Sequence, residues 1–263
     1  MNTLSGNQIT QPIHVSASQL KTYQSCPRKH WLQKVAQVPS QKLKMGAERG
    51  KRLHSLVEQY LTTAPAYTGE TFPAFLETHK LWDHELRHGL RSASKGDHLT
   101  ELREASFDPE TPLRLLVEQE FKLSHLFLGF MDVVVLDSRQ GSLSVGIRDH
   151  KFMSDKRSIM DEDLAKSDFQ TLIYAKALLT FFAVDSVTWS YDYYGTKYCW
   201  HEKVNFTLTR SDLECRWLPV LIETSRVLDN YSIPCGSQTT PSYLSCGKYG
   251  GCEYKPICFG GTK

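Results

Sequence analysis

The sequence lacks the features of a membrane or secreted protein. No apolar run approaches the roughly 18 residues that predict a membrane span. The first residues contain no basic segment followed by an apolar core, which would indicate a secretory signal. We therefore expect a cytoplasmic protein without a membrane partner. The net charge is only +2, so composition gives no sign of a polyanionic partner, and any basic surface must be local.

The signatures of nucleotide-driven motors and of repeat proteins are also missing. The sequence contains no Gly-X-X-X-X-Gly-Lys-Ser/Thr phosphate loop, no internal repeat and no low-complexity segment. Its 263 residues, of which 40% are hydrophobic, suit one globular domain with an ample core. We expect a single domain over 1–263, with a helical part at 15–110, a core at 111–210, and a C-terminal helix and cysteine-rich tail at 211–263.

Hydrophobic periodicity predicts an α/β (α+β) protein with a central mixed sheet flanked by helices. Ser16 or Ser18 can cap a first helix that breaks at Cys26-Pro27. Further helices are predicted over 46–61, 72–90, 168–183 and 211–228. Strands are predicted over 113–123, 126–137, 143–153, 187–194 and 203–208.

Four of the seven cysteines lie close to the two ends of the chain. Cys26 is near the start, and Cys246, Cys252 and Cys258 are in the last stretch. A cytosolic chain keeps its thiols reduced, so this pattern predicts a soft-metal site that ties the chain ends together. The remaining cysteines have no ligand spacing and are expected to be ordinary thiols: Cys199, Cys215 and Cys235.

The ligand spacing bears on which metal these thiolates hold. Zinc sites with four cysteines usually pair their ligands as Cys-X-X-Cys knuckles, and this sequence has none. One distant cysteine followed by a late trio fits a 4Fe-4S cluster better. A structural zinc ion and free thiols remain the alternatives.

Two carboxylates and a lysine lie on consecutive predicted strands. Asp132 is flanked by apolar residues, and an acid there costs several kcal/mol unless it is paired or metal-bound. Side chains alternate along a strand, so Asp149 and Lys151 face the same way. Asp132 and Asp149 can then hold one Mg²⁺ or Mn²⁺ ion, while Lys151 orients a water or steadies a phosphate. His150 faces away, but its carbonyl can reach the metal; the alternative is a solvated Asp–Lys pair.

Two helical pairs are further candidates for this site. His54 and Glu58 lie one turn apart, and His54 is a potential metal ligand, although a lone helical histidine is more often a surface or core residue. Gln170 and Tyr174 are also one turn apart and can present a face to a phosphate backbone or a base. A tyrosine in the core beside an incidental glutamine is the alternative.

Taken in order, these motifs resemble the PD-(D/E)XK nuclease superfamily, and within it the iron–sulfur branch of RecB/AddB-like and CRISPR-adaptation nucleases. The resemblance covers roughly residues 15–260. Its motifs are Tyr23-X-X-Cys26-Pro-Arg, Gly50-X-X-X-His54-X-X-X-Glu58, Gly129-X-X-Asp132, Asp149-X-Lys151, Gln170-X-X-X-Tyr174 and the three late cysteines.

The resemblance implies a restriction-endonuclease-like fold and a role for each of these residues. Metal ligands would be His54, Asp132, Asp149 and the carbonyl of His150, with Asp132, Asp149 and Lys151 as the catalytic residues. Gln170 and Tyr174 would position a DNA strand. Cys26, Cys246, Cys252 and Cys258 would ligate the 4Fe-4S cluster.

Two features fall outside the motifs of the family. Helicase-associated relatives usually have two residues between the first two late cysteines, whereas five separate Cys246 from Cys252 here. Glu118 and Glu120 precede Asp132 on the neighbouring strand, and either one can assist the site. The motif does not require them, so neither is assigned.

The resemblance implies a Mg²⁺- or Mn²⁺-dependent deoxyribonuclease, most simply an exonuclease on single strands or DNA ends in recombination, repair or replication. The absence of a phosphate loop means that the chain has no motor of its own, so it acts either alone or beside a helicase or recombinase. The compact size suits a phage or plasmid protein, and a phage protein would act in the host cytoplasm. A non-catalytic nucleic-acid-binding or CRISPR-adaptation accessory module is the alternative function, and RNA or a structured junction is an alternative substrate.

Overall fold

The computed structural model describes residues 13–40, 45–67, 69–95, 98–247 and 252–258. Among these residues, no helix is long and apolar enough to cross a membrane.

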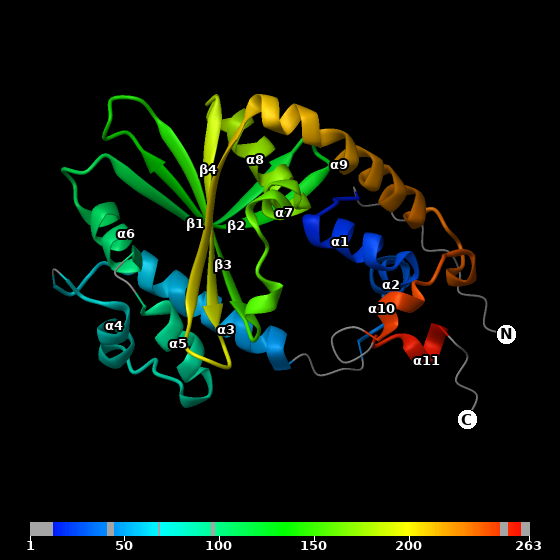
Figure 1. Ribbon diagram of the computed structural model, residues 1–263, viewed down its shortest axis with the longest axis horizontal. Helices are drawn as coiled ribbons and strands as arrows, with labels where there is room; N and C mark the ends of the chain where they lie inside the picture. The colour runs from blue at the N-terminus through cyan, green and yellow to red at the C-terminus, as the bar shows by residue number, and fades with distance from the viewer. Residues whose placement is uncertain (1–12, 41–44, 68, 96–97, 248–251, 259–263) are drawn as a thin grey trace. The chain divides into compact units, whose positions relative to one another are not determined.

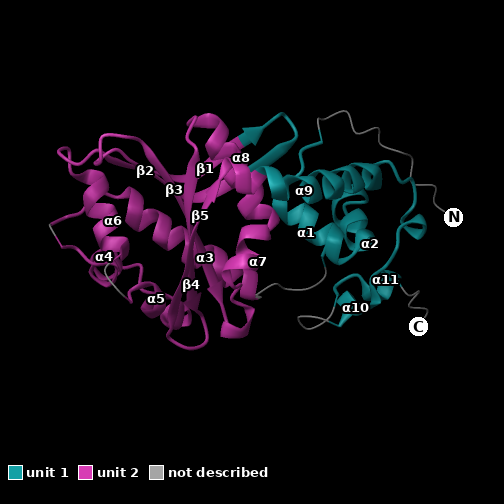
Figure 2. Ribbon diagram, turned by 45° about the horizontal axis from the view of Figure 1, so that its top comes forward, with its two compact units in different colours: residues 1–43, 122–129, 214–263 teal, residues 44–121, 130–213 magenta. Residues whose placement is uncertain are grey.

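The chain divides into two compact units, which Figure 2 shows in different colours. Unit 1 comprises 1–43, 122–129 and 214–263, and unit 2 comprises 44–121 and 130–213. Each unit therefore combines segments that are distant in the sequence. The division does not test whether the units act as one nuclease domain, so the single-domain assignment stays a prediction.

Unit 2 is built on a five-stranded mixed sheet with the order β1-β2-β3-β4-β5. Strands β2 and β3 are antiparallel, β3 and β4 are parallel, and β4 and β5 are antiparallel. The parallel pair requires a crossover, which contains two helices. The strands are β1 (Leu113–Leu123), β2 (Phe127–Asp137), β3 (Ser144–Met153), β4 (Ser186–Gly195) and β5 (His201–Thr209).

Helices cover both faces of this sheet (Figure 1). The crossover helices α7 (Glu162–Ser167) and α8 (Phe169–Phe181) lie on one face, where Thr171 of α8 hydrogen-bonds Tyr191 of β4. The helices of unit 2 that precede the sheet in the chain lie on the other face: α3 (Met45–Thr62), α4 (Phe72–Thr78), α5 (Arg87–Ala93) and α6 (His98–Phe107). The expected mixed sheet flanked by helices is confirmed.

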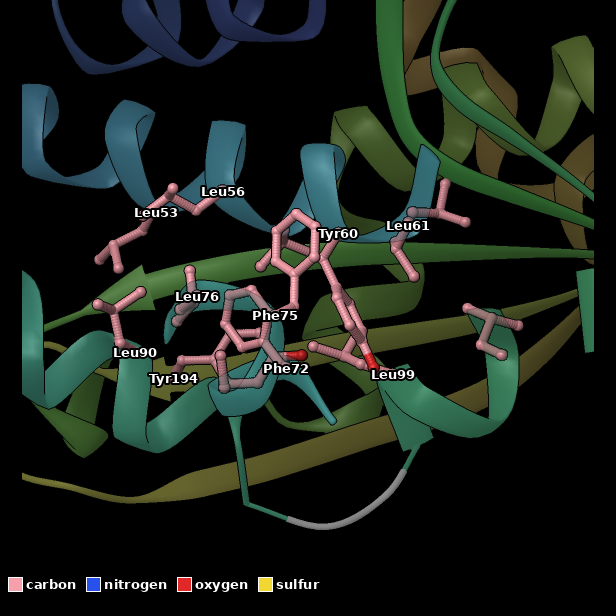
Figure 3. Close-up of a cluster of buried hydrophobic side chains, with 14 of the residues drawn as sticks. Leu53, Leu56, Tyr60, Leu61, Phe72, Phe75, Leu76, Leu90, Leu99 and Tyr194 are labelled. Atoms are coloured by element: carbon pink, nitrogen blue, oxygen red, sulfur yellow. The ribbon is translucent and has the colours of Figure 1, made fainter. Parts of the chain in front are cut away.

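A hydrophobic core lies between the sheet and the helices α3 to α6. Figure 3 shows the apolar stripe of α3 pointing toward α4 and α5. Tyr60 is fully buried, and its hydroxyl donates to the carbonyl of Glu70 at 2.7 Å. Other members of the core are Leu53, Leu56, Leu61, Phe72, Phe75, Leu76, Leu90, Leu99 and Tyr194. This packing fixes α3 against the sheet and so positions the residues that α3 supplies to the site.

Unit 1 contains the start and the end of the described chain. Helix α1 (Ala17–Ser25) is capped by Ser16, whose hydroxyl accepts from the amide of Gln19. Helix α2 (Pro27–His30) starts at Pro27 and continues as a π-helical turn, η1 (Trp31–Val35). The long helix α9 (Arg210–Tyr231) starts in unit 2, and α10 (Tyr243–Cys246) and α11 (Lys255–Cys258) follow.

One predicted helix differs from the structure. The segment 72–90 is not continuous, because α4 ends at Thr78 and Lys80 adopts a positive φ of 54°. Asp83 then caps a 3₁₀ turn, η2 (His84–Leu86), before α5 begins. Helices α6 and α7 were not predicted. The remaining 3₁₀ turns are η3 (Lys156–Ser158) and η4 (Gly236–Gln238).

Candidate active site and cysteine site

The pairing of β2 with β3 brings the two expected aspartates together. Val133 is opposite Arg148 in this antiparallel pair, so the preceding Asp132 and the following Asp149 lie on the same face of the sheet. The amide of His150 donates to Oδ2 of Asp132 at 2.8 Å. Asp132 is thereby held against the strand that carries Asp149.

Lys151 and Gln170 complete a closed set of contacts around Asp149. The ammonium of Lys151 contacts the carboxylate of Asp149 and donates to Oε1 of Gln170 at 3.2 Å. Nε2 of Gln170 donates to Oδ1 of Asp149. Gln170 is in the first turn of α8, where Asp168 accepts from its amide at 2.9 Å. The helix start therefore fixes the side chain that joins Asp149 to Lys151.

His54 and Glu118 approach Asp132 from two other elements. Nδ1 of His54, on α3, is 3.5 Å from Oδ2 of Asp132. One ligand atom from each of His54, Glu118 and Asp132 lies within 4.8 Å of the others. Glu118 adopts φ 49° within β1, a strained conformation for a residue with a β-carbon. The structure thus adds Glu118, which sequence reasoning left unassigned, to the expected site.

The charges of this site favour a bound cation. Burial, and then the charge of Asp149, raise the pKa of Asp132 well above its usual value. Burial and the charges of Glu58 and Asp149 raise the pKa of Glu118. Several carboxylates therefore repel one another in a partly desolvated space, and a divalent cation would relieve that repulsion. This donor set, with hard oxygens and one imidazole, suits Mg²⁺ or Mn²⁺.

The histidine and lysine of the site are in the protonation states that such chemistry needs. Burial, followed by the nearby His150, lowers the pKa of His54 to about 4, so its ring is neutral at neutral pH and can act as a ligand. Burial alone would lower the pKa of Lys151, but the charges of Asp149 and Asp132 raise it. Lys151 therefore stays a cation.

Two other predicted site residues have buried side chains, as expected for His150 and as the alternative for Tyr174 allowed. The side chain of His150 is buried on the opposite face of the sheet, where Nδ1 lies 3.2 Å from the hydroxyl of Tyr194. Tyr174 is 8% exposed, and its ring packs edge-on against Phe121 with centroids 5.0 Å apart. Its contact with a DNA strand and the metal contact of the His150 carbonyl stay predictions.

Comparison with protein families supplies the deciding observation. The family model described as the PD-(D/E)XK nuclease superfamily matches residues 14–259. The chain belongs to the PD-(D/E)XK nuclease superfamily. Its mixed sheet with flanking helices is the restriction-endonuclease-like fold that the sequence motifs predicted, and its Asp132, Asp149 and Lys151 lie together as that resemblance requires.

Solved structures support this fold. A crystal structure of a candidate exonuclease from Eubacterium rectale matches with a TM-score of 0.50 and 11% identity, covering 93% of this chain and 91% of that chain. At this identity, the likeness concerns the fold alone. The structure of SSO0001 matches with a TM-score of 0.28 and 15% identity, covering 81% of this chain and 96% of that chain, and adds no support. Comparison with curated proteins gives no match.

The four bracketing cysteines of this PD-(D/E)XK protein come together in unit 1. Burial, and then the thiols of Cys252 and Cys26, raise the pKa of Cys246. Burial also raises the pKa of Cys258; the positive charge of Arg28 opposes this shift, and the other three thiols add to it. The amides of Lys29 and Ser242 donate to the sulfur of Cys26 at 3.4 and 3.3 Å.

The surrounding contacts hold the first and last described segments of unit 1 to each other. Tyr254 packs with Trp31 and Leu32, and its hydroxyl donates to the carbonyl of Val38 at 3.0 Å. Nε1 of Trp31 donates to the carbonyl of Ile233 at 2.8 Å. The other three cysteines of the chain are exposed: Cys199, Cys215 and Cys235.

Proposed function

We propose that the protein is a metal-dependent deoxyribonuclease that hydrolyses phosphodiester bonds, acting as an exonuclease on single strands or DNA ends. The observation that carries this proposal is the convergence of Asp132, Asp149, His54 and Glu118 beside Lys151. A binding module does not need several partly buried carboxylates that repel one another. A metal-dependent hydrolase uses such a group to hold a cation.

The residues of the site have separable roles. His54, Asp132, Asp149 and the carbonyl of His150 would hold Mg²⁺ or Mn²⁺, with Glu118 as an added ligand. The ion would supply Lewis-acid polarisation of the phosphate and a water of lowered pKa.

Lys151 is positioned to contact the reacting groups. Its ammonium stays protonated, and Gln170 and Asp149 fix its position. The side chains of Lys151 and His54 each keep 30% of their surface exposed, whereas Asp149 keeps 1%. Lys151 would orient the attacking water or neutralise the scissile phosphate.

The family supports a nucleic-acid substrate, because a nuclease acts on nucleic acid. Gln170 at the start of α8 lies beside Lys151, where it can also contact a strand. The sequence has no phosphate loop and so no motor of its own. We propose that the protein acts in recombination, repair or replication, either alone or beside a helicase or recombinase.

The cysteine site would hold a 4Fe-4S cluster with a structural role. The ligand spacing supports this assignment, because the sequence has no Cys-X-X-Cys knuckle of the kind that zinc sites with four cysteines usually have. One distant cysteine followed by a late trio fits a cubane cluster better.

Metal analysis of anaerobically purified protein tests the cluster. We expect four iron atoms and acid-labile sulfide per chain, with loss of both in Cys26→Ser and retention of both in Cys199→Ser, whose thiol is exposed. A colourless, iron-free protein that contains stoichiometric zinc would overturn this assignment.

End-labelled DNA tests the nuclease proposal. Single-stranded and double-stranded oligonucleotides, labelled at either end, are incubated with Mg²⁺, Mn²⁺ or EDTA. We expect metal-dependent release of labelled mononucleotides or short products from one end, and no cleavage in EDTA. Cleavage within a covalently closed circle would contradict the exonuclease mode, and intact substrates in every metal would contradict the enzyme. RNA and junction substrates serve as the comparison for specificity.

A further inference from the structure

A second cluster of potential ligands lies on the face of the sheet opposite the active site. His98 is in the first turn of α6, Asp192 is on β4, and His201 is on β5. One ligand atom from each lies within 4.8 Å of the others. Nε2 of His201 is 3.2 Å from Oδ1 of Asp192, and Nε2 of His98 is 3.9 Å from the same oxygen.

We infer that these three residues form a second metal site, selective for a zinc-class divalent cation that binds imidazole, and separate from the nuclease centre. Two imidazole nitrogens and one carboxylate oxygen, with a further position open to water, form a ligand set that Zn²⁺ prefers and Mg²⁺ does not. This inference does not depend on the proposed nuclease activity.

The two oxygens of Asp192 are divided between different partners. Oδ2 lies 3.4 Å from Nη1 of Arg148 and 3.3 Å from the hydroxyl of Ser190. Oδ1 faces His98, His201 and Nζ of Lys203, which is 3.8 Å away. Arg148 and Ser190 therefore orient the carboxylate so that Oδ1 points toward the two imidazoles, as outer contacts do for ligands in metal sites.

The arrangement of the two histidines suits metal ligation. Their rings stack with centroids 4.8 Å apart and planes 17° from parallel, and both Nε2 atoms approach the same oxygen. Burial lowers the pKa of His98 to about 3, so this imidazole is neutral and retains a lone pair at neutral pH. Asp192 itself is fully buried. An ion at this position would therefore have a charged oxygen ligand shielded from water.

Lys203 competes with the ion for Oδ1 of Asp192. It lies on the edge strand β5, and its side chain is 32% exposed, so it can turn to solvent when an ion binds. Arg148 stays at the other oxygen. These two cations lower the affinity for a metal, and removing Lys203 should raise it. A cluster made only of structural ion pairs predicts no gain in zinc affinity, because loss of Lys203 would give it no new ligand.

The site would join three elements and reach the strand that carries the catalytic residues. A bound ion would connect α6 to β4 and β5. The hydroxyl of Tyr194 lies 3.0 Å from Nε2 of His98 and 3.2 Å from Nδ1 of His150, which follows Asp149. When an ion takes the lone pair of His98, Tyr194 keeps His150 as its partner.

Equilibrium dialysis of the full-length protein against Zn²⁺, followed by metal analysis, tests this inference. The parent is compared with His201→Ala, His98→Ala, Lys203→Ala and His79→Ala. Zinc at the cysteines and at the nuclease centre contributes equally to all five proteins and cancels in the comparison. His201→Ala and His98→Ala should each bind one ion fewer per chain, or bind it at least about 10-fold more weakly. His79→Ala, at an exposed position, should keep that ion, and Lys203→Ala should bind it more tightly than the parent.

A thermal melt provides a second readout if a histidine variant folds poorly. Zn²⁺ should raise the melting temperature of the His79→Ala and Lys203→Ala proteins by more than Mg²⁺ does. Equal zinc content in the parent and both His variants would overturn the site. A Lys203→Ala protein that binds zinc no more tightly than the parent would also overturn it.

Discussion

At the scale of single residues, the placement of the candidate site residues was predictable where strand alternation determines the face. Asp149 and Lys151 are two residues apart on one strand, so they must point the same way, and the structure places them in contact. Asp132 was predictable because an acid in an apolar strand needs a partner. These inferences need no tertiary information beyond the pairing of consecutive strands.

Glu118 shows where this reasoning ends. Glu118 and Glu120 are two residues apart, so alternation gives both the same face and cannot choose between them. The positive φ of Glu118 interrupts the regular alternation of the strand, and the structure places Glu118 with His54 and Asp132. The cluster of His98, Asp192 and His201 was equally hidden, because its members are far apart in the sequence and share no motif spacing.

Glu118 gives a prediction at this scale. In Glu118→Gln, the metal loses one negative ligand, and we expect the Mn²⁺ concentration for half-maximal cleavage to rise by about 10-fold. Titration of Mn²⁺ at fixed DNA concentration measures this half-maximal concentration. Glu120→Gln is the matched control, because Glu120 is exposed and lies outside the ligand group. An equal shift in both variants would indicate a general charge effect and remove Glu118 from the site.

At the scale of elements, the strands were predicted better than the helices of the first half. Three consecutive strands with short turns leave little freedom, and their predicted bounds agree with β1 to β3 within one residue. The segment 72–90 carries apolar residues at helical spacing, yet it breaks where Lys80 enters a left-handed turn and Asp83 starts a new capped turn. Periodicity does not detect a break that preserves the apolar face.

The end of β4 gives a prediction at this scale. A β-carbon on Gly195 would overlap the carbonyl oxygen of Tyr198 and Nε1 of Trp200. Gly195→Ala should therefore lower the free energy of unfolding by about 1–3 kcal/mol. Gly50→Ala is the control, because its β-carbon would meet nothing within 4 Å inside α3, and we expect a gain of about 0.5–1 kcal/mol. Denaturant unfolding of both variants measures the difference, and equal stabilities would contradict this packing.

At the scale of the whole molecule, the two units have different metals and different tasks in our account. Unit 2 contains the nuclease residues, and unit 1 contains the four clustered cysteines. The sequence predicted this separation of a hard-ligand site from a soft-ligand site. It did not predict that the segments would form two compact units, since unit 1 is assembled from three segments that only tertiary contacts bring together.

Buried neutral histidines make the stability of the molecule depend on pH. Burial, and then the charge of Lys34, lower the pKa of His30 to about 4, and Asn230 donates to its Nδ1 at 2.8 Å. The unfolded chain binds a proton near pH 6.5, whereas the folded chain resists it until about pH 4. The stabilisation is therefore complete above pH 6.5 and is lost as the pH falls toward 4.

Denaturant unfolding between pH 7 and pH 4 checks this dependence. His30 alone should contribute up to about 1.4 kcal/mol per pH unit within that window. His30→Gln should reduce the dependence of the unfolding free energy on pH by close to one proton. The slope is compared instead of the absolute stability, so a general loss of stability does not affect the result. An unchanged slope in His30→Gln would contradict the assignment of a buried neutral imidazole.

The most direct test of the account is single-turnover cleavage of end-labelled single-stranded DNA in saturating Mn²⁺ by the parent and by Lys151→Ala. The ammonium of Lys151 is predicted to act on the reacting phosphate or water, so its loss should lower the cleavage rate by at least about 100-fold. Mn²⁺ affinity should remain. Lys166→Ala removes a lysine of α7 that is paired with Glu162, and this variant should cleave at the parental rate. A Lys151→Ala protein that cleaves DNA as fast as the parent would contradict the proposed nuclease centre.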